Sequence, residues 1–309
     1  MTELQQSTAY FRDNFVPFQE ANISIASAPV LYGLATYTVF PVFWNEEHQK
    51  AYIFRLQDHF KRLNDSCRIL AFEDFAMNWD YEQFEQMIQE LLQKNNVRED
   101  SLVRVSVFVD DILQGTRMHK LKHSLSAFVY PAEPLLPKDG ANLCVSSWRR
   151  TPDNAIPSRA KINGSYVNGS LMKHEAVLNG FDDAIALDEH GHVSESTVAN
   201  IFLVRNNQLL TPSVATDLME GITRNTILKL AGHFNIAHKQ CSIDRSELYI
   251  ADEIFLCGSS MNITPVLSVD HRKIGTGSAG KITQQFMSAY DDCGRGRLEP
   301  FSHWLTPVA

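Results

Sequence analysis

Three prolines fall within nine residues near the middle of the chain, in the segment Pro131 to Asp139 (PAEPLLPKD). Proline fixes one backbone dihedral and donates no amide hydrogen bond, so a run of this density disfavours helix and sheet. The chain has 309 residues, which is longer than one ordinary compact core. We therefore predict a small first domain at residues 1–130, a linker at residues 131–139 and a larger second domain at residues 140–309.

The first domain is predicted to mix strands with helices. Leu31 to Trp44 is rich in β-branched and aromatic residues, and Ala51 to Phe54 resumes this pattern after a polar break, as in a β-hairpin. Leu56 to Leu70 and Phe84 to Leu92 carry apolar residues at helical spacing. Further strands are expected at residues 102–109 and 124–130.

The second domain is also predicted to mix the two kinds of element. Its expected strands are residues 143–147, 183–187, 192–195, 201–204 and 253–257, and its expected helices are residues 171–179, 224–233 and 281–290. Gly180 is a plausible end of the first of these helices. The order lacks a regular βαβ rhythm, so the α+β class fits better than a doubly wound parallel sheet.

Composition excludes several classes of function. The formal net charge of -8, without a local Lys/Arg-rich run, argues against a nucleic-acid partner. No apolar stretch is long enough for a membrane span, and the polar start of the chain lacks a signal peptide. Five scattered cysteines without CxxC spacing indicate reduced thiols rather than a disulfide framework or a zinc site. We expect a cytoplasmic protein with no metal.

The first of three short polar clusters is Ser158 to Tyr166 (SRAKINGSY). Lys161 lies among small residues, and a lysine whose pKa is lowered by confinement can form a Schiff base. Tyr166 could donate a hydrogen bond to a ring oxygen of a cofactor. On spacing alone an exposed loop lysine is favoured over a catalyst, because lysines are usually exposed.

The other two clusters contain small residues that can donate hydrogen bonds. Gly221-Ile222-Thr223-Arg224 opens a predicted helix, whose first N–H groups can bind phosphate; the alternative is an ordinary helix cap. Cys257-Gly258-Ser259-Ser260 follows a predicted strand and could donate to a phosphate or a carboxylate; the alternative is a plain turn. His190 and His192 are interpreted as part of a turn, because no third metal ligand is evident.

Taken together and in order, the motifs resemble the class IV aminotransferases, including the branched-chain aminotransferases. The resemblance rests on residues 31–40 (LYGLATYTVF), 54–66 (FRLQDHFKRLNDS), 146–204, 219–231 (MEGITRNTILKLA) and 248–266. Each motif is weak, but the ordered set is specific and spans roughly residues 27–290. It implies a two-domain α+β fold similar to D-amino acid aminotransferase, with a small N-terminal α/β domain and a larger C-terminal mixed β domain with helices.

The resemblance also implies pyridoxal 5'-phosphate (PLP) as the cofactor. Lys161 would bind it as a Schiff base and move a proton between the substrate and the cofactor. Glu195 would pair with the pyridine nitrogen and keep the ring cationic, so that the ring can accept electrons. The remaining implied contacts are Tyr166 with the phenolic oxygen, Met219 with the ring face, and Arg62, Gly221, Ile222, Thr223 and Ser259 with the phosphate and its binding turn.

The substrate side departs from the branched-chain pattern. Where those enzymes have an FEGIR-like stretch, this chain has Tyr37 to Pro41 (YTVFP), which is closer to (R)-selective amine transaminases. The tyrosine of the family's YIR strand aligns with Leu102, while the arginine is retained as Arg104. A carboxylate buried here without donors would be unfavourable by several kcal/mol. Either Arg104 or Arg117 compensates, or the natural substrate lacks this carboxylate.

The implied activity is amino-group transfer from an amino acid or amine to 2-oxoglutarate or pyruvate by a ping-pong mechanism, as in branched-chain amino-acid biosynthesis. The alternatives are an (R)-selective amine or D-amino acid transaminase and 4-amino-4-deoxychorismate lyase. The resemblance implies a homodimer in which Tyr32 reaches the pocket of the other subunit. The substrate-binding candidates are Tyr32, Tyr37, Val39, Arg104, Arg117, Ser259 and Ser260.

Overall fold

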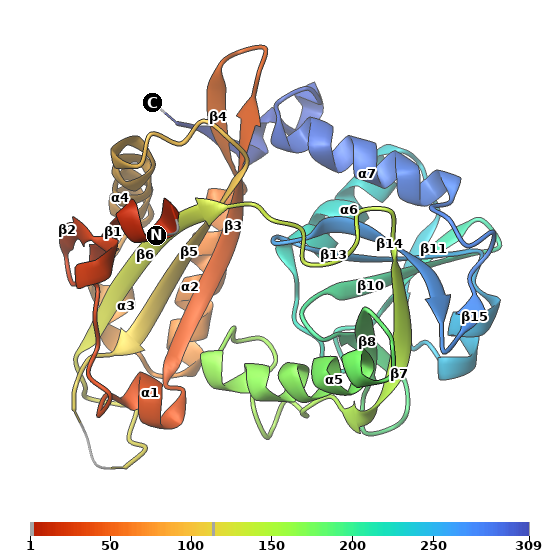
Figure 1. Ribbon diagram of the computed structural model, residues 1–309, viewed down its shortest axis with the longest axis horizontal. Coiled ribbons are helices and arrows are strands. Elements are labelled where there is room, and N and C mark those ends of the chain that lie inside the picture. The colour runs from red at the N-terminus through yellow and green to blue at the C-terminus, as the bar shows by residue number, and fades with distance from the viewer. Residues whose placement is uncertain (1–2, 113–114, 309) are drawn as a thin grey trace. The chain divides into compact units, whose positions relative to one another are not determined.

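The computed structural model describes residues 3–112 and 115–308, which form two compact units (Figure 1). The first unit comprises Met1–Glu133, Ala160–Gly164 and Cys293–Ala309, and the second comprises Pro134–Arg159 and Ser165–Asp292. Residues 113 and 114, which precede the predicted substrate-binding residue Arg117, lie outside the described residues. No helix in the described part of the chain is both long and apolar enough to cross a membrane.

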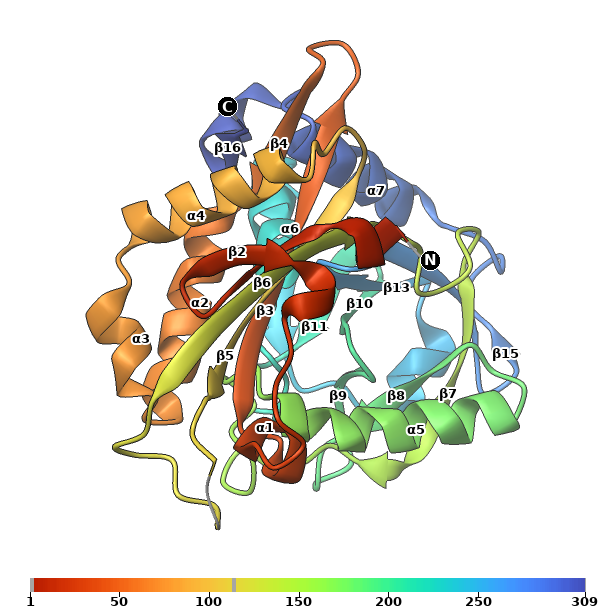
Figure 2. The same cartoon turned by 60° about the vertical axis from the view of Figure 1, so that its left-hand side comes forward.

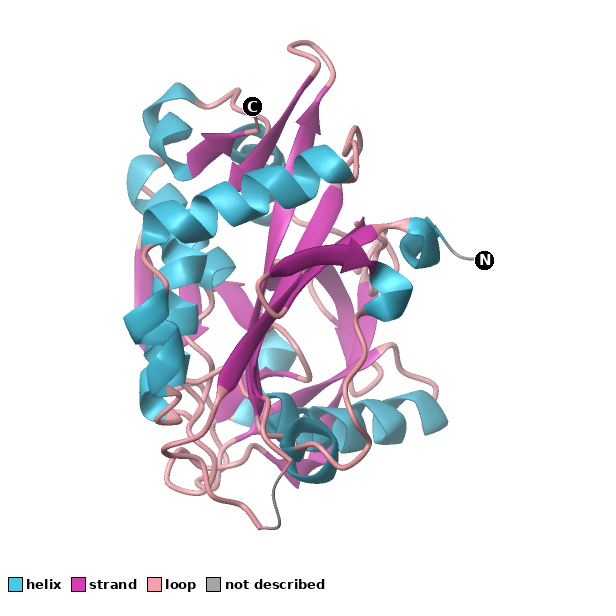
Figure 3. Ribbon diagram, turned by 90° about the vertical axis from the view of Figure 1, so that its left-hand side faces the viewer, coloured by secondary structure: helices cyan, strands magenta, loops and turns pink. Residues whose placement is uncertain are grey.

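The first unit is built on a seven-stranded antiparallel sheet with the order β16-β4-β3-β5-β6-β1-β2. Helices lie along its strands, as Figures 2 and 3 show. The strands are β1 (Thr8–Phe11), β2 (Asn14–Pro17), β3 (Ala35–Asn45), β4 (Lys50–Phe54), β5 (Ser101–Val109), β6 (His123–Pro131) and β16 (Leu305–Pro307). The helices are α1 (Ala28–Tyr32), α2 (Leu56–Ile69), α3 (Glu73–Asn78) and α4 (Tyr81–Lys94).

Local sequence explains the helices of this unit. In α4, Asp80 accepts a hydrogen bond from the backbone of Gln83, and the Gln83 side chain accepts one from the backbone of Asp80. This reciprocal cap satisfies two N–H groups at the start of the helix. The predicted helix at residues 56–70 is observed as α2, and it packs against β3. Both helices bury one face, with the spacing typical of amphipathic helices.

The second unit contains a nine-stranded mixed sheet. Eight of its strands follow the order β12-β11-β10-β13-β14-β7-β8-β9, and the ninth, β15, pairs with β14. Figure 1 shows α5 alongside β7 and β8. The strands are β7 (Ala141–Arg149), β8 (Asp183–Leu187), β9 (Val193–Ser196), β10 (Asn200–Arg205), β11 (Gln208–Pro212), β12 (His238–Cys241), β13 (Glu253–Gly258), β14 (Asn262–Val269) and β15 (Arg272–Lys273). The helices are α5 (Tyr166–Leu178), α6 (Ile222–His233) and α7 (Lys281–Gly294).

A core of aliphatic side chains holds this sheet together. Ile185, Ile201, Leu203, Ile254 and Leu256 are each less than 3% exposed and belong to one cluster. The helix α5 ends at Leu178 and is followed by Gly180 with a φ of +79°, as predicted for its C-terminus. The mixture of parallel and antiparallel strand pairs agrees with the predicted α+β class.

The units differ from the expected domain limits in two segments, because long-range pairing decides where those segments belong. Residues 160–164 join the first unit, where Ile162 forms a β-bridge with Thr36. Residues 293–309 also join the first unit, where β16 pairs with β4 and Arg295 forms an ion pair with Asp100. The linker at residues 131–139 stays a prediction; residues 132–140 form neither helix nor strand.

Candidate active site

Lys161 is held by its backbone on two sides within the first unit. Its carbonyl oxygen accepts hydrogen bonds from the Tyr37 amide (3.0 Å) and from the Thr36 hydroxyl (2.9 Å). Its amide donates to the Ser66 hydroxyl at 3.2 Å. These contacts attach the lysine to both β3 and α2, and the residue is only partly exposed. The alternative of an exposed loop lysine therefore does not describe Lys161.

The side chains around Tyr37 bring positive charge together. The Lys161 Nζ lies 5.0 Å from the centre of the Tyr37 ring, and the Arg104 Cζ lies 3.6 Å from it. The register of β3 and β5 places Val39 directly opposite Arg104. No ion pair found among the described residues includes Arg104. Two cations beside one aromatic ring make a favourable place for an anionic ligand.

Arg62 projects from α2 toward a buried hydroxyl and a buried imidazole. Its Nη2 donates to the Thr38 Oγ1 at 3.1 Å and lies 3.4 Å from the His59 Nδ1. The same hydroxyl lies 2.8 Å from that nitrogen. Burial, together with the nearby Arg62, Arg55 and Lys161, lowers the pKa of His59 well below its usual value. The imidazole is therefore neutral at neutral pH, and the positive charge stays on the guanidinium.

Glu195 is a buried carboxylate on β9 of the second unit, and both of its oxygens are bound. Oε1 lies 2.7 Å from the Arg150 Nη2, and Oε2 accepts hydrogen bonds from the Asn200 Nδ2 (3.0 Å) and the Met219 amide (3.3 Å). The side chains of Arg150 and Glu195 are 12% and 8% exposed. A guanidinium at this distance favours the ionised form of a buried carboxylate.

Sequence reasoning missed Arg150 and Asn200. The available signals were the paired arginines at the end of β7 and a polar residue at the start of β10, which is otherwise apolar until Arg205. Neither signal identifies Glu195 as the carboxylate that these two residues bind, because its position depends on the antiparallel pairing of β9 with β8.

Gly221 is the N-cap of α6, and the helix has no side-chain cap. A Cβ at position 221 would lie 2.0 Å from the Asn200 Oδ1, which is far inside contact distance, so any residue other than glycine would require the Asn200 amide to move. Ile222 and Thr223 are buried in the first turn, and the Thr223 hydroxyl lies 3.5 Å from the Tyr290 hydroxyl. The predicted helix start is therefore observed, with a glycine in place of a side-chain cap at its N-terminus.

The other predicted residues take varied positions. Tyr166 begins α5, and Ser259 and Ser260 form the turn after β13; all three are half-buried. Tyr32 ends α1, where its hydroxyl accepts a hydrogen bond from the Gly115 amide at 3.2 Å. Arg117 is exposed in the segment after β5.

The two histidines of the HxH motif lie near acidic groups. His192 is 3.4 Å from Asp188 and 3.9 Å from Asp244, and His190 is 3.7 Å from Glu189. Across the part of the chain that the structure describes, no three His, Cys, Asp or Glu side chains are grouped as metal ligands.

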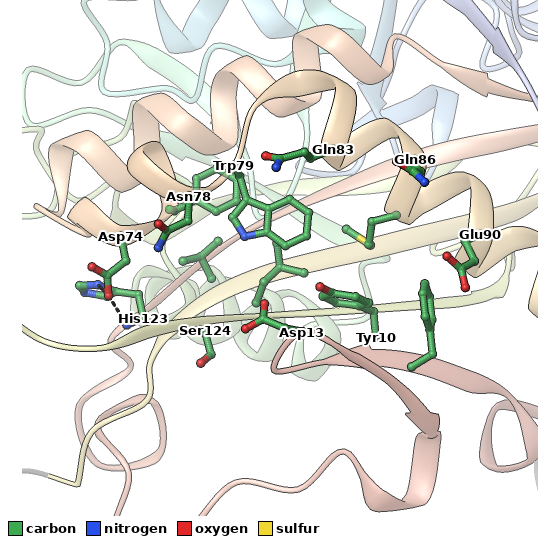
Figure 4. Close-up of a pocket in the computed structure, with 15 residues that line it drawn as sticks. Tyr10, Asp13, Asp74, Asn78, Trp79, Gln83, Gln86, Glu90, His123 and Ser124 are labelled. Carbon is green, nitrogen blue, oxygen red and sulfur yellow. Dashed lines mark hydrogen bonds and ion pairs between the residues drawn. The ribbon is translucent and has the colours of Figure 1, made fainter.

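A cavity of about 480 Å³ in the first unit contains none of the predicted site residues (Figure 4). Its walls are aromatic and acidic, and include Tyr10, Trp79 and Asp74. Asp74 accepts a hydrogen bond from the His123 amide at 3.0 Å, and Trp79 packs edge-on against Tyr10. Because none of the predicted cofactor or substrate residues lines this cavity, it is not the candidate active site.

The chain is similar to known proteins in both sequence and fold. Residues 37–269 match the family model described as Amino-transferase class IV. The chain is 37% identical to a probable branched-chain-amino-acid aminotransferase of Aquifex aeolicus, over 97% of this chain and 96% of that protein. The fold is similar to the branched-chain aminotransferase of Thermoproteus uzoniensis solved with norvaline (TM-score 0.92, 31% identity, 98% of this chain and 99% of that one). It is also similar to that of Thermobaculum terrenum in its PLP form (TM-score 0.92, 29% identity, 99% of each chain).

Proposed function

We propose, given that this chain belongs to the class IV aminotransferase family, that its amino donor is a branched-chain L-amino acid and its acceptor a 2-oxo acid. The protein is an enzyme, a PLP-dependent aminotransferase. The substrate proposal is supported by relatives of 30–37% identity that are described as branched-chain aminotransferases. We further propose that the acceptor is 2-oxoglutarate or pyruvate, and that the enzyme acts in the cytoplasm.

One observation carries the proposed substrate class, namely that the Arg104 guanidinium is set in an apolar wall. Tyr37, Val39 and Leu102 are 6%, 5% and 3% exposed, and they belong to the same strand pair as Arg104. An aliphatic side chain gains free energy by leaving water for such a wall, at about 25 cal/mol per Å² of buried apolar surface. A dicarboxylate acceptor needs a donor on the same wall, and the Arg104 guanidinium supplies one.

The residues present fit PLP at three points. Glu195, whose carboxylate pairs with the Arg150 guanidinium, is suited to a protonated pyridine nitrogen. Arg62, next to a neutral His59, brings a net positive charge for the phosphate, and the uncapped start of α6 brings backbone donors. When bound, PLP supplies an electron sink for the bond that breaks at the substrate Cα.

We assign the remaining steps to this chain's own residues. The Lys161 amine would bind the cofactor and, when released, would take the proton from the substrate Cα and deliver it to C4′ of the cofactor. Its backbone contacts to β3 and α2 hold the main chain of Lys161 in place while the side chain moves. Tyr166 donates to the phenolic oxygen of the cofactor, and Arg104 orients the acceptor by its second carboxylate. Ser259 and Ser260 donate to the substrate carboxylate and the phosphate.

A homodimer is proposed as the working state. Helix α5 carries apolar side chains on its exposed surface, with Val167, Val177 and Leu178 each more than half exposed, and Leu171 38% exposed. A contiguous apolar surface of this kind is typical of a subunit interface. A second copy of the chain is the proposed partner, and light scattering on the purified enzyme should give twice the mass of 35.0 kDa.

A donor of the opposite configuration is the second candidate, since Tyr37, Thr38 and Leu102 depart from the branched-chain pattern. The test is a half-reaction with purified enzyme and one amino donor at a time, followed by the absorbance of the bound cofactor. L-Leucine, L-isoleucine or L-valine should convert the spectrum. Conversion by D-amino acids or (R)-amines alone would favour the second candidate. Pyruvate release from 4-amino-4-deoxychorismate without an acceptor would favour the lyase.

A further inference from the structure

Asn200 is a buried amide at the first position of β10, and it is only 5% exposed. Its Nδ2 donates to the Glu195 Oε2 at 3.0 Å and to the Met219 carbonyl at 2.9 Å. A primary amide has two N–H donors, so both are used. One donor is directed to the carboxylate and the other to the segment that leads into α6.

The oxygen of the same amide lies against the start of α6. A Cβ built on Gly221 would lie 2.0 Å from the Asn200 Oδ1 and 3.3 Å from its Cγ. Since Gly221 has a φ of -68°, the conflict comes from this contact and not from the backbone conformation. Asn200 thus touches both Glu195 and the residue that caps the helix.

Two further contacts join Glu195 to the same segment. The Met219 amide donates to the Glu195 Oε2 at 3.3 Å. The Arg150 guanidinium, which binds the Glu195 Oε1, donates through Nε to the Asp217 carbonyl at 3.2 Å. The carboxylate and residues 217–221 are therefore linked at several points, with Asn200 between them.

We propose that Asn200 is a positioning residue that couples the orientation of Glu195 to the N-terminus of α6. The inference rests on the proposed function, in which Glu195 binds the pyridine nitrogen of PLP and the start of α6 binds its phosphate. Without the amide, the carboxylate loses one donor and is held less firmly, while the Met219–Gly221 segment loses a hydrogen bond to its carbonyl. Both ends of the cofactor site then change together, although Asn200 itself need not touch either end.

The test follows both ends of the bound cofactor in one sample of holoenzyme. Phosphorus-31 NMR reports the environment of the phosphate, and nitrogen-15 NMR with labelled cofactor reports the pyridine nitrogen. In Asn200→Ala and in the isosteric Asn200→Asp, both resonances should move, and the dissociation constant for PLP should rise about tenfold, the loss of one hydrogen bond to a charged group.

Asn45→Ala is the matched control. Asn45 is a buried amide of the first unit, 3% exposed, which donates to the Arg295 carbonyl and accepts from the His48 amide. Its loss should lower the melting temperature and leave both resonances in place. Gly221→Ala tests the coupling from the other end: the added Cβ should displace the Asn200 amide and shift the nitrogen-15 resonance, although the change is made at the phosphate end.

The outcomes separate the inference from the proposed function. If Asn200 variants only melt earlier, with both resonances and the dissociation constant unchanged, the residue is structural and the inference is wrong. If the nitrogen-15 resonance moves alone in Asn200 variants, Asn200 serves Glu195 without coupling, which also overturns it. A wild-type protein that binds no PLP refutes the proposed function instead.

Discussion

The guanidinium of Arg104 lies over the ring of Tyr37, with its Cζ 3.6 Å from the ring centre. The two residues come from neighbouring strands, β5 and β3, whose register is fixed by eight residue pairs. The Tyr37 ring therefore sets where this cation stands in an otherwise apolar wall. The ring covers one face of the guanidinium. The N–H donors of Arg104 lie in the guanidinium plane, where they can bind a carboxylate.

Arg104→Leu should weaken binding of 2-oxoglutarate. Losing a charge-assisted hydrogen bond of about 1.5–3 kcal/mol corresponds to a rise in KM of roughly tenfold to a hundredfold. The KM for a branched-chain donor should change much less, because its side chain needs only the apolar wall. Steady-state kinetics with each substrate varied in turn measures both effects, and Arg98→Leu, on the exposed surface, is the control. An equal effect on donor and acceptor would argue against this role.

Thr38→Val should weaken cofactor binding while nearly keeping the side-chain shape. The Thr38 hydroxyl bonds to both Arg62 and His59, so its removal leaves the guanidinium less firmly placed. We expect the dissociation constant for PLP to rise about tenfold, equivalent to about 1.4 kcal/mol. Equilibrium dialysis measures it. Thr216→Val removes a buried hydroxyl that donates to the Ser213 carbonyl in the second unit and should leave cofactor affinity unchanged.

The lowered pKa of the buried His59 should make the stability of the protein depend on pH. Its folded pKa is lowered, first by burial and then by the cations around it, while the unfolded residue titrates near 6.5. Below about pH 6.5 the unfolded chain binds a proton here and the folded chain does not. The free energy of unfolding is therefore fully maintained above that pH and falls as the pH decreases, by up to about 1.4 kcal/mol per unit.

Urea unfolding of the wild type and of His59→Gln between pH 5 and pH 8 checks this prediction. The difference in the free energy of unfolding between the two proteins should be largest near pH 8, where His59 is neutral in both the folded and the unfolded wild type. It should shrink toward pH 5, where the unfolded wild type binds a proton at His59. His123, whose pKa is also lowered by burial, contributes equally to both proteins and cancels. His48→Gln, at an exposed site, is the control. Parallel curves for wild type and His59→Gln would contradict a neutral His59.

Replacing each of two helical glycines with alanine should change the stability of the protein in opposite directions. A Cβ at Gly169 in α5 would lie 2.6 Å from the Thr197 carbonyl oxygen. Because this oxygen belongs to the backbone, relieving the clash would require the main chain at residue 197 to move. We expect Gly169→Ala to destabilise the protein by about 1–3 kcal/mol. At Gly232 in α6 nothing lies within 4 Å of the added Cβ, so Gly232→Ala should stabilise it by about 0.5–1 kcal/mol. Thermal unfolding of the holoenzyme measures both, and a similar loss in both variants would contradict the close packing of α5 on residue 197.

The sequence predicts the regular elements of this fold well, because their periodicity is local. Helix α2 follows from apolar positions between Leu56 and Leu70, and the strands β3 and β5 follow from their β-branched and aromatic residues. The placement of residues 160–164 and 293–309 could not be predicted, since it depends on pairing with β3 and β4 far away in the chain. The roles of Arg150 and Asn200 could not be predicted for the same reason, because they depend on contacts with Glu195 that form only in the folded chain.

The central claim is that Lys161 carries the cofactor. The direct measurement is reduction of the purified holoenzyme with borohydride, which fixes PLP to the lysine that binds it, followed by peptide mapping by mass spectrometry. We expect a single phosphopyridoxyl-modified peptide containing Lys161, and no such modification in Lys161→Ala. Modification of a different lysine in the wild type, or a modified Lys161→Ala protein that retains turnover, would contradict it.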